Sequence, residues 1–317
     1  MKNDFKIVYM GTPEFAVEPL KALIEGGYRI AAVVTAPDRP AGRGLEIKST
    51  EVKQFALANS LPVLQPEKLR DAQFIDRLNA INADLFVVVA FRMLPETVWS
   101  LPAKGTINLH ASLLPDYRGA APINHAIING EKETGVTTFL ISHKIDTGAI
   151  LLSAKVGIGD NETAGELHNK LQKEGSQLLL QTVEMLKNGN VEPQPQIDRQ
   201  GLKLAPKLFR HNCRIDWTQS AEKIRNLIRG LSPYPGAWTE YTVDNKTYQM
   251  KIYQASAETR KHGKQIGAAV SDGKKYLKIA CDDGYLNIEI MQIQGKKTMP
   301  VNVFLSGFRE TGKMRFL

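Results

Sequence analysis

Two polar side chains at the end of a short apolar segment have the types and spacing needed for acid–base chemistry. Asn108 and His110 lie two residues apart in the first half of the stretch Gly105–Pro122, which predicts a short buried strand. Residues two apart on a strand project from the same face. A carboxamide can donate a hydrogen bond to a developing oxyanion, and an imidazole can donate one or move a proton. The same two residues also fit a plainer interpretation, in which His110 is only a hydrogen-bonded group at a strand end.

A carboxylate further along the chain supplies the third group that such a site needs. Asp146 begins an Asp-Thr-Gly sequence between two segments predicted as strands, Thr134–Ile141 and Ala149–Val156. It therefore lies in a tight connection, from which it could fix an imidazole or relay a proton. The sequence lacks the Gly-x-Ser-x-Gly nucleophile elbow. Direct attack by a substrate nucleophile is therefore favoured over a covalent enzyme intermediate.

The elements that position these residues alternate between strands and helices. Phe5–Met10 predicts a strand, a helix follows from about Pro13 to Glu25, and Arg29–Thr35 predicts a second strand. Asp84–Ala90 is the most apolar run and predicts a central strand buried on both faces. The expected fold class is α/β, with a doubly wound, Rossmann-like, mostly parallel sheet. Further helices are expected near Thr50–Ala58, Ala72–Ile81, Glu96–Ser100, Ala121–Ile128 and Glu162–Lys187, and a strand at Pro62–Leu64.

A basic loop follows the second predicted strand. Residues 36–44 contain two prolines and two glycines, so no regular structure is expected there. Arg39, Arg43 and Lys48 make the loop basic, although a solvated surface loop would carry such charges equally well. The first turn of the chain has a single glycine after its strand and so lacks the Gly-x-Gly-x-x-Gly fingerprint. Nothing in the sequence therefore points to a nicotinamide cofactor.

The polar segment 188–197, with two prolines and no periodicity, marks a domain boundary. We expect a catalytic domain over residues 1–189, a linker over 190–206 and a C-terminal domain over 207–317. In that last part a helix is predicted at Ala221–Leu231. It is followed by segments rich in β-branched and aromatic residues, which predict a small OB-like β-barrel. These segments are Ala237–Val243, Tyr248–Tyr253, Gln265–Val270, Tyr276–Ala280 and Leu286–Ile293.

Composition narrows the class of protein. The 317 residues are 43% hydrophobic and 23% charged, as in a globular protein. No apolar run reaches the roughly 18 residues of a membrane span, and no signal peptide is apparent, so a cytoplasmic protein without a membrane partner is expected. Neither Cys213 nor Cys281 has a second Cys or His at metal-ligand spacing, so we expect no metal. A cytosolic chain of this size gains little from one disulfide, so we expect two free thiols.

The net charge of +8 is concentrated in the last third of the chain. Residues 203–317 hold 20 Lys and Arg against 10 Asp and Glu, whereas residues 1–202 hold 21 against 23. This asymmetry indicates a polyanionic partner for the C-terminal part, or else a basic surface that only aids solubility.

Several motifs resemble those of a known family. The chain resembles the folate-dependent formyltransferases in Asn108-Leu-His110-Ala-Ser112-Leu-Leu-Pro115-x-Tyr-Arg118-Gly119-Ala-Ala-Pro122, followed by Asp146-Thr-Gly148. It resembles the tRNA-formylating branch of that family in segments 11–15, 37–44, 205–208, 214–217 and 228–235. The resemblance covers nearly the whole chain.

The resemblance implies transfer of a formyl group from 10-formyltetrahydrofolate to the α-amine of methionine on initiator methionyl-tRNA. Asn108 and His110 would stabilise the oxygen of the tetrahedral intermediate, and Asp146 would assist proton transfer towards the folate nitrogen. No metal is implied, and the chain is expected to be a monomer. A sugar-nucleotide N-formyltransferase with the same donor is the nearest alternative. A non-catalytic RNA-binding protein of this fold is a further one.

The resemblance also assigns binding residues. The folate donor would lie against Phe91, Arg92, Met93, Leu94, Ser112, Leu113, Leu114, Pro115 and Gly119. The tRNA would be bound by Arg39, Arg43, Lys48, Lys203, Lys207 and Arg210, with Arg214, Lys223, Arg225 and Arg229 extending a phosphate-facing surface. The chain departs from the family in two places. Residues 90–95 are one residue shorter than the usual Ala-Tyr-Gly-x-x-Leu-Pro and carry Arg92 in place of the Gly, and Leu45-Glu46 replaces a Lys pair.

Overall fold

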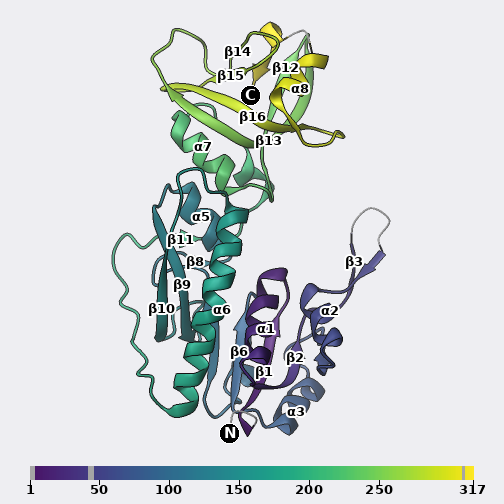
Figure 1. Ribbon diagram of the computed structural model, residues 1–317, viewed down its shortest axis with the longest axis vertical. Coiled ribbons are helices and arrows are strands. Elements are labelled where there is room, and N and C mark those ends of the chain that lie inside the picture. Colours follow the sequence, from purple (N-terminus) through teal and green to yellow (C-terminus); the bar gives the residue numbers. More distant parts are fainter. Residues whose placement is uncertain (1–3, 42–45, 309–310) are drawn as a thin grey trace. The chain divides into compact units, whose positions relative to one another are not determined.

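The computed structural model describes residues 4–41, 46–308 and 311–317, which form two compact units (Figure 1). Unit 1 contains the described residues of Met1–Gly119, Glu133–Gly157 and His168–Leu204. Unit 2 contains those of Ala120–Lys132, Ile158–Leu167 and Ala205–Leu317. The domain boundaries at residues 189/190 and 206/207 stay a proposal beside this division.

Unit 1 is built on a seven-stranded sheet. Its strands are β1 (Lys6–Gly11), β2 (Arg29–Val34), β5 (Val63–Leu64), β6 (Leu85–Val89), β7 (Thr106–His110), β9 (Glu133–Leu140) and β10 (Ile150–Gly157). They lie in the order β10-β9-β7-β6-β1-β2-β5. The pairings from β5 to β7 are parallel, whereas β9 is antiparallel to both β7 and β10. The expected mostly parallel α/β fold is confirmed.

Two helices of unit 1 begin at capping residues that the sequence supplies. The helices of this unit are α1 (Val17–Glu25) after the short 3₁₀ helix η2 (Glu14–Ala16), α2 (Glu51–Ala58), α3 (Ala72–Ile81), α4 (Glu96–Trp99) and most of α6 (Ala164–Asn188). Thr50 and Asp71 cap α2 and α3, since their side-chain oxygens accept hydrogen bonds from backbone N–H groups three residues on. These helix starts follow from local sequence.

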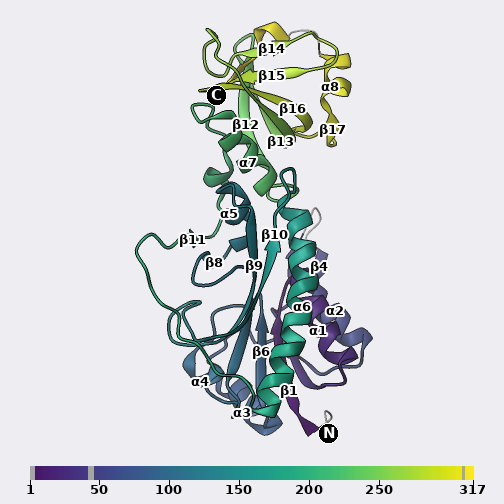
Figure 2. The ribbon, with the colours of Figure 1, turned by 60° about the vertical axis from the view of Figure 1, so that its left-hand side comes forward.

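Helices cover both faces of this sheet. On one face Phe86 and Val88 of β6 form a core with Phe74 of α3 and Val98 of α4. On the other, α1 and α6 run side by side (Figures 1 and 2). All five residues of β6 are buried, which confirms the predicted central strand. Because successive strand residues point to opposite faces of the sheet, every second side chain of β7 points away from α6.

The basic loop after β2 contains a small hairpin. β3 (Arg39–Ala41) pairs antiparallel with β4 (Glu46–Lys48), and Arg39 lies opposite Lys48. The expectation that residues 36–44 hold no regular structure is therefore wrong at Arg39–Ala41. A two-stranded ribbon has free edges, where the missing N–H of Pro40 is tolerated. The carboxylate of Asp38 holds the base of the hairpin through Lys53 at 2.5 Å and Gln65 at 2.9 Å.

Unit 2 is built around an antiparallel sheet, as the sequence predicts. Its strands are β12 (Ala237–Val243), β13 (Lys246–Thr259), β14 (Ala269–Ser271), β15 (Leu277–Ala280), β16 (Gly284–Ile293) and β18 (Arg315–Phe316), with β17 (Met299–Pro300) paired to β16. Side chains of β12 alternate between buried and partly exposed. The amphipathic helix α7 (Ala221–Gly230) adds Ile224 and Ile228 to the same core.

Short elements complete the described chain. They are β8 (Arg118–Gly119), α5 (Pro122–Ile128), β11 (Leu204–Ala205), η3 (Arg210–Cys213), α8 (Val301–Gly307) and η4 (Thr311–Lys313). Among the residues that the structure describes, no helix has the length and apolar character needed to cross a membrane.

Candidate active site

His110 ends β7, and the loop that follows holds its ring. Leu109 packs against α6, since an added Cβ at Gly175 of that helix would lie 3.0 Å from a Leu109 methyl. His110 therefore points to the opposite face, where it is 7% exposed. Its Nε2 lies 2.9 Å from the Tyr117 carbonyl oxygen. A carbonyl only accepts, so Nε2 carries a proton and Nδ1 is the nitrogen left for a reacting group.

Asp146 faces that second nitrogen. Its Oδ2 lies 3.9 Å from His110 Nδ1, which is longer than a hydrogen bond. The backbone N–H of Gly119 donates to the same oxygen at 2.9 Å. The Asp146 side chain is 11% exposed. The structure therefore brings together an imidazole and a carboxylate that lie 36 residues apart in the sequence.

The backbone of the Asp-Thr-Gly turn restricts which residues can occupy its first and last positions. Asp146 has φ +54°, a left-handed conformation that Asp adopts more readily than most residues. A Cβ on Gly148 would lie 1.6 Å from the Leu140 carbonyl oxygen. Only glycine therefore allows the chain to return to β10 this close to the end of β9.

Asn108 shares the face of β7 on which His110 lies. Its neighbours in the sheet are Val88 and Phe139. Its Oδ1 is buried and has no hydrogen-bond partner among the described residues. An unsatisfied buried acceptor is unfavourable by about 1–3 kcal/mol, and a ligand N–H would satisfy it.

The loop after β7 is anchored to β9 by short polar contacts. Ser112 is fully buried, and its Oγ donates to the Asp116 carbonyl at 2.7 Å. Thr137 Oγ1 donates to the Ser112 carbonyl at 2.7 Å and accepts from the Leu114 N–H at 3.2 Å. The candidate folate residues of this loop are Ser112, Leu113, Leu114, Pro115 and Gly119. The loop thus returns to Asp146 through its last residue.

The turn after β6 holds the other candidate folate residues. Arg92 donates to the carbonyls of Pro66 and Glu67 at 2.7 and 2.9 Å, and its guanidinium lies 5.4 Å from the Phe91 ring centroid. Burial lowers the pKa of Arg92, and the nearby Arg39 lowers it further. Leu94 packs in the core, whereas Met93 is 71% exposed. The side chains of this turn therefore point in different directions.

The candidate tRNA-binding residues of unit 2 lie beside aromatic rings. Lys207 Nζ is 5.7 Å from the centroid of Phe209, and the Arg210 guanidinium is 5.0 Å from that of Trp238. Phe209 is 53% exposed. Exposed rings with cations above them can stack bases and contact phosphates.

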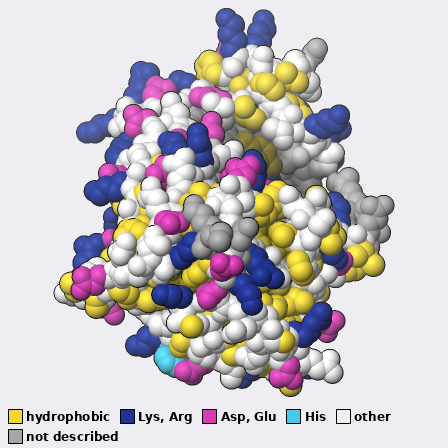
Figure 3. Space-filling model, turned by 60° about the horizontal axis from the view of Figure 1, so that its bottom comes forward, with side chains coloured by type: hydrophobic (Ala, Val, Ile, Leu, Met, Phe, Trp, Pro, Cys, Tyr) yellow, Lys and Arg dark blue, Asp and Glu magenta, His cyan; other side chains and the backbone are white. Residues whose placement is uncertain are grey.

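The candidate tRNA-binding residues of unit 1 are Arg39, Lys48 and Lys203, all exposed. Arg43 lies outside the described residues. On the face shown in Figure 3, Lys and Arg side chains are interspersed with Asp and Glu.

Two arginines expected on the phosphate-facing surface have other roles, so that part of the prediction is wrong. Arg229 is 6% exposed, and its guanidinium donates to Asn226 and to the Glu162 carbonyl. Burial lowers the pKa of Arg229. The Arg225 side chain is 14% exposed and forms an ion pair with Glu222. Both arginines connect α7 to the segment before α6, and so they stabilise unit 2. The prediction failed because the charge of a helix does not reveal which of its side chains are buried.

Sequence reasoning did not single out Gln196, which contacts the candidate site. Its carboxamide nitrogen donates to the carbonyls of Asp146 and Gly148. The polar segment that carries it gave no signal, because it has neither periodicity nor a motif.

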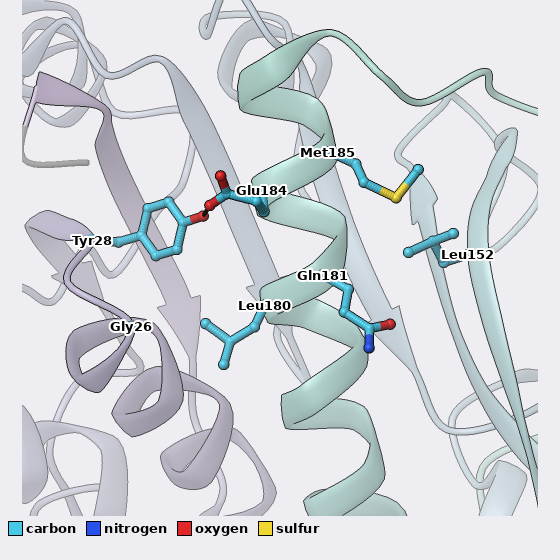
Figure 4. A pocket seen from close by; sticks show the side chains of 7 residues that line it. All are labelled: Gly26, Tyr28, Leu152, Leu180, Gln181, Glu184 and Met185. Carbon is cyan, nitrogen blue, oxygen red and sulfur yellow. Dashed lines mark hydrogen bonds between the residues drawn. The ribbon is translucent and has the colours of Figure 1, made fainter. Parts of the chain in front are cut away.

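A separate hollow of about 530 Å³ lies beside α6. Figure 4 shows Tyr28 pointing to Glu184, while Gln181 and Met185 leave the helix towards Leu152. The Tyr28 hydroxyl donates to Glu184 at 2.5 Å, and burial raises the pKa of Tyr28 above its usual range. The hollow shares no lining residue with the candidate active site.

Two family profiles match the chain. The formyl transferase profile matches residues 5–183, and the profile of the formyl transferase C-terminal domain matches residues 207–309. The methionyl-tRNA formyltransferase of Bacteroides thetaiotaomicron is 49% identical over 312 residues, 97% of either chain. That of Flavobacterium johnsoniae is 51% identical over 302 residues, 95% of this chain and 96% of that protein.

Solved structures share the fold at lower identity. The N-formyltransferase of Helicobacter canadensis, in complex with folinic acid and dTDP-3-aminofucose, has a TM-score of 0.63 at 22% identity over 90% of this chain and 98% of that one. HypX of Aquifex aeolicus, in complex with tetrahydrofolic acid, has a TM-score of 0.62 at 17% identity over 94% of this chain and 46% of that one.

Proposed function

The chain belongs to the formyl transferase family, and we propose that it transfers a formyl group to the α-amine of methionine on initiator methionyl-tRNA. Full-length relatives with about half of their residues identical carry the name methionyl-tRNA formyltransferase. The observation in the structure that supports the chemistry best is the approach of Asp146 to His110 at 3.9 Å. A cytoplasmic location remains part of this proposal.

The formyl donor in this proposal is 10-formyltetrahydrofolate. Two structures with the same fold were solved with folate compounds, folinic acid and tetrahydrofolic acid. The proposed donor site consists of the turn Phe91–Leu94 and the loop Ser112–Gly119, which follow the neighbouring parallel strands β6 and β7. Both are firmly held, by the Arg92 and Thr137 hydrogen bonds respectively. A rigid wall of this kind favours a fixed orientation of the donor.

The three polar groups divide the chemistry between them. The neutral amine attacks the formyl carbon, and negative charge develops on the formyl oxygen. Asn108 would donate to that oxygen through its amide nitrogen, and His110 would donate through Nδ1 when that nitrogen carries a proton. Asp146 would take the proton that the amine loses and pass it towards the departing folate nitrogen. No covalent bond to the protein is needed.

The hairpin β3–β4 supports the proposed tRNA contact in unit 1. Arg39 and Lys48 are directly opposite each other across its two strands. Like charges at this spacing repel, and a phosphate group between them would relieve the repulsion. The exposed Lys203 of unit 1 and Lys207 and Arg210 of unit 2 are proposed as further contacts. Phosphate contacts of this kind position an RNA without reading its sequence.

A formyl-transfer assay with three acceptors tests the function. The full-length chain is mixed with 10-formyltetrahydrofolate and with initiator methionyl-tRNA, elongator methionyl-tRNA or a dTDP-linked amino sugar. We expect transfer to the initiator tRNA, with much less to the other two. Transfer to the amino sugar alone would instead support a sugar-nucleotide N-formyltransferase. The absence of folate turnover with all three would favour an RNA-binding protein.

A further inference from the structure

Gln196 reaches the candidate active site from the segment that follows α6. The backbone of Gln194 exchanges two hydrogen bonds with that of Ile150, both 2.8 Å long. Ile150 begins β10, two residues after Gly148. This pairing fixes the course of the segment, and Gln196 lies two residues farther along, against the Asp146–Gly148 turn.

Both ends of the Gln196 carboxamide are used. Its Nε2 donates to the Asp146 carbonyl at 2.9 Å and to the Gly148 carbonyl at 2.8 Å. Its Oε1 accepts from Arg118 Nε and Nη2 at 3.1 and 2.7 Å. Since carbonyls only accept and a guanidinium only donates, the amide has one possible orientation.

These contacts close a ring around Asp146. Arg118 is followed by Gly119, whose N–H donates to Asp146 Oδ2. Asp198 forms an ion pair with Arg118 at 2.8 Å and so holds the guanidinium in place. The carboxylate of Asp146 and its own backbone carbonyl are therefore held through two adjacent residues, Arg118 and Gly119.

We propose that Gln196 is a positioning residue for Asp146. It holds the left-handed turn, with φ +54° at Asp146, in the one arrangement that directs Oδ2 at His110. It donates to backbone atoms and acts on the reaction only through Asp146. The catalytic consequence rests on the proposed function, because that function makes Asp146 the acid–base group. The role of Gln196 in holding the turn does not depend on the proposed function.

Three variants of the full-length chain test the role. Gln196→Ala removes all four hydrogen bonds. Gln196→Glu keeps the acceptor for Arg118 but places a carboxylate against two carbonyls. Gln194→Ala is the matched control. The Gln194 side chain is exposed, and among the described residues it donates only to the Glu192 carbonyl, while its backbone makes the pairing with Ile150.

Two readouts separate positioning from general destabilisation. We expect kcat for formyl transfer to fall at least tenfold in Gln196→Ala and Gln196→Glu. This loss is part of the roughly 10²–10⁴-fold acceleration that acid–base catalysis supplies. The KM values for donor and tRNA should stay within about twofold of those of the parent chain. In the background of Asp146→Asn, Gln196→Ala should lower kcat no further, since its effect passes through Asp146. Gln194→Ala should behave as the parent chain does.

A third readout does not depend on the reaction. The NMR signals of the His110 imidazole should shift in both Gln196 variants and stay in place in Gln194→Ala. Unchanged kcat and His110 signals in Gln196→Ala would overturn the proposal, as would a loss confined to KM or one shared by Gln194→Ala. If the parent chain transfers no formyl group while the His110 signals still respond to Gln196→Ala, the proposed function fails and the positioning role stands.

Discussion

The backbone N–H of Gly119 donates to Asp146 Oδ2, the same oxygen that faces His110 Nδ1. The loop after β7 thereby fixes the carboxylate from one side, and the imidazole approaches it from the other. A charge held by a backbone donor needs no rearrangement when a proton moves.

Replacement of Asp146 by Asn should remove the base and keep the turn. Asn also tolerates a left-handed conformation, and its amide oxygen can still accept from Gly119. We expect the transfer rate to fall by about 10²–10⁴-fold, with a thermal midpoint close to that of the parent chain. Rates come from the tRNA assay and the midpoint from circular dichroism. A variant that transfers formyl groups as fast as the parent would contradict the assigned role.

Gly148→Ala should disturb the same turn through its backbone. The new Cβ would meet the Leu140 carbonyl at 1.6 Å, so the chain must move. We expect a loss of about 1–3 kcal/mol in the free energy of unfolding, together with slower transfer. Gly157→Ala in β10 is the control, because a Cβ there would have no heavy atom of the described residues within 4 Å. Equal stability of the two variants in denaturant titrations would show that the turn yields easily.

The paired cations of the β3–β4 hairpin should contribute to tRNA binding through charge alone. With Arg39→Gln and Lys48→Gln combined, we expect weaker binding and a salt dependence reduced by about one unit of slope for each lost contact. The measurement is tRNA affinity over a series of salt concentrations. Lys155→Gln, which removes a cation paired with Glu133, should leave the slope unchanged. A slope that stays the same in the double variant would remove the hairpin from the interface.

The two cysteines should be unreactive in the folded protein. Burial raises the pKa of Cys281 to about 11, with a further contribution from the charge of Asp283, and burial also raises the pKa of Cys213. Because the folded protein favours the neutral thiols, their contribution to stability is intact below the ordinary thiol pKa of about 8.5 and is lost as the pH rises through the folded values. At a pH near the ordinary thiol pKa of about 8.5, we therefore expect iodoacetamide to alkylate the folded chain slowly and the chain in denaturant rapidly. Mass spectrometry measures the extent of alkylation. Equally fast labelling of folded and unfolded chains would contradict the prediction that the folded thiols are unreactive.

Local sequence was sufficient for most of the sheet and helices of unit 1. Apolar runs such as Leu85–Val89 and caps such as Asp71 act within a few residues, so they can be read directly. The hairpin at Arg39–Ala41 was missed, because Pro40 masks a pairing that a two-stranded ribbon accepts. The antiparallel direction of β9 is set by its partners in the sheet, which the periodicity of a single segment does not reveal.

The candidate site shows the same division. Asn108, His110 and Asp146 belong to motifs and could be named from the sequence. Gln196 could not, because its place depends on the pairing of Gln194 with Ile150, 44 residues away. Arg229 was misplaced for the opposite reason, since its charge suggested a surface while the fold buries it.

The pairing of Gln194 with Ile150 bears on how the protein can be divided. A fragment ending at Gly189 would contain Asn108, His110 and Asp146 and would still lack Gln196, whose carboxamide holds the Asp146 turn. The shortest active form of the protein should therefore extend past Gln196.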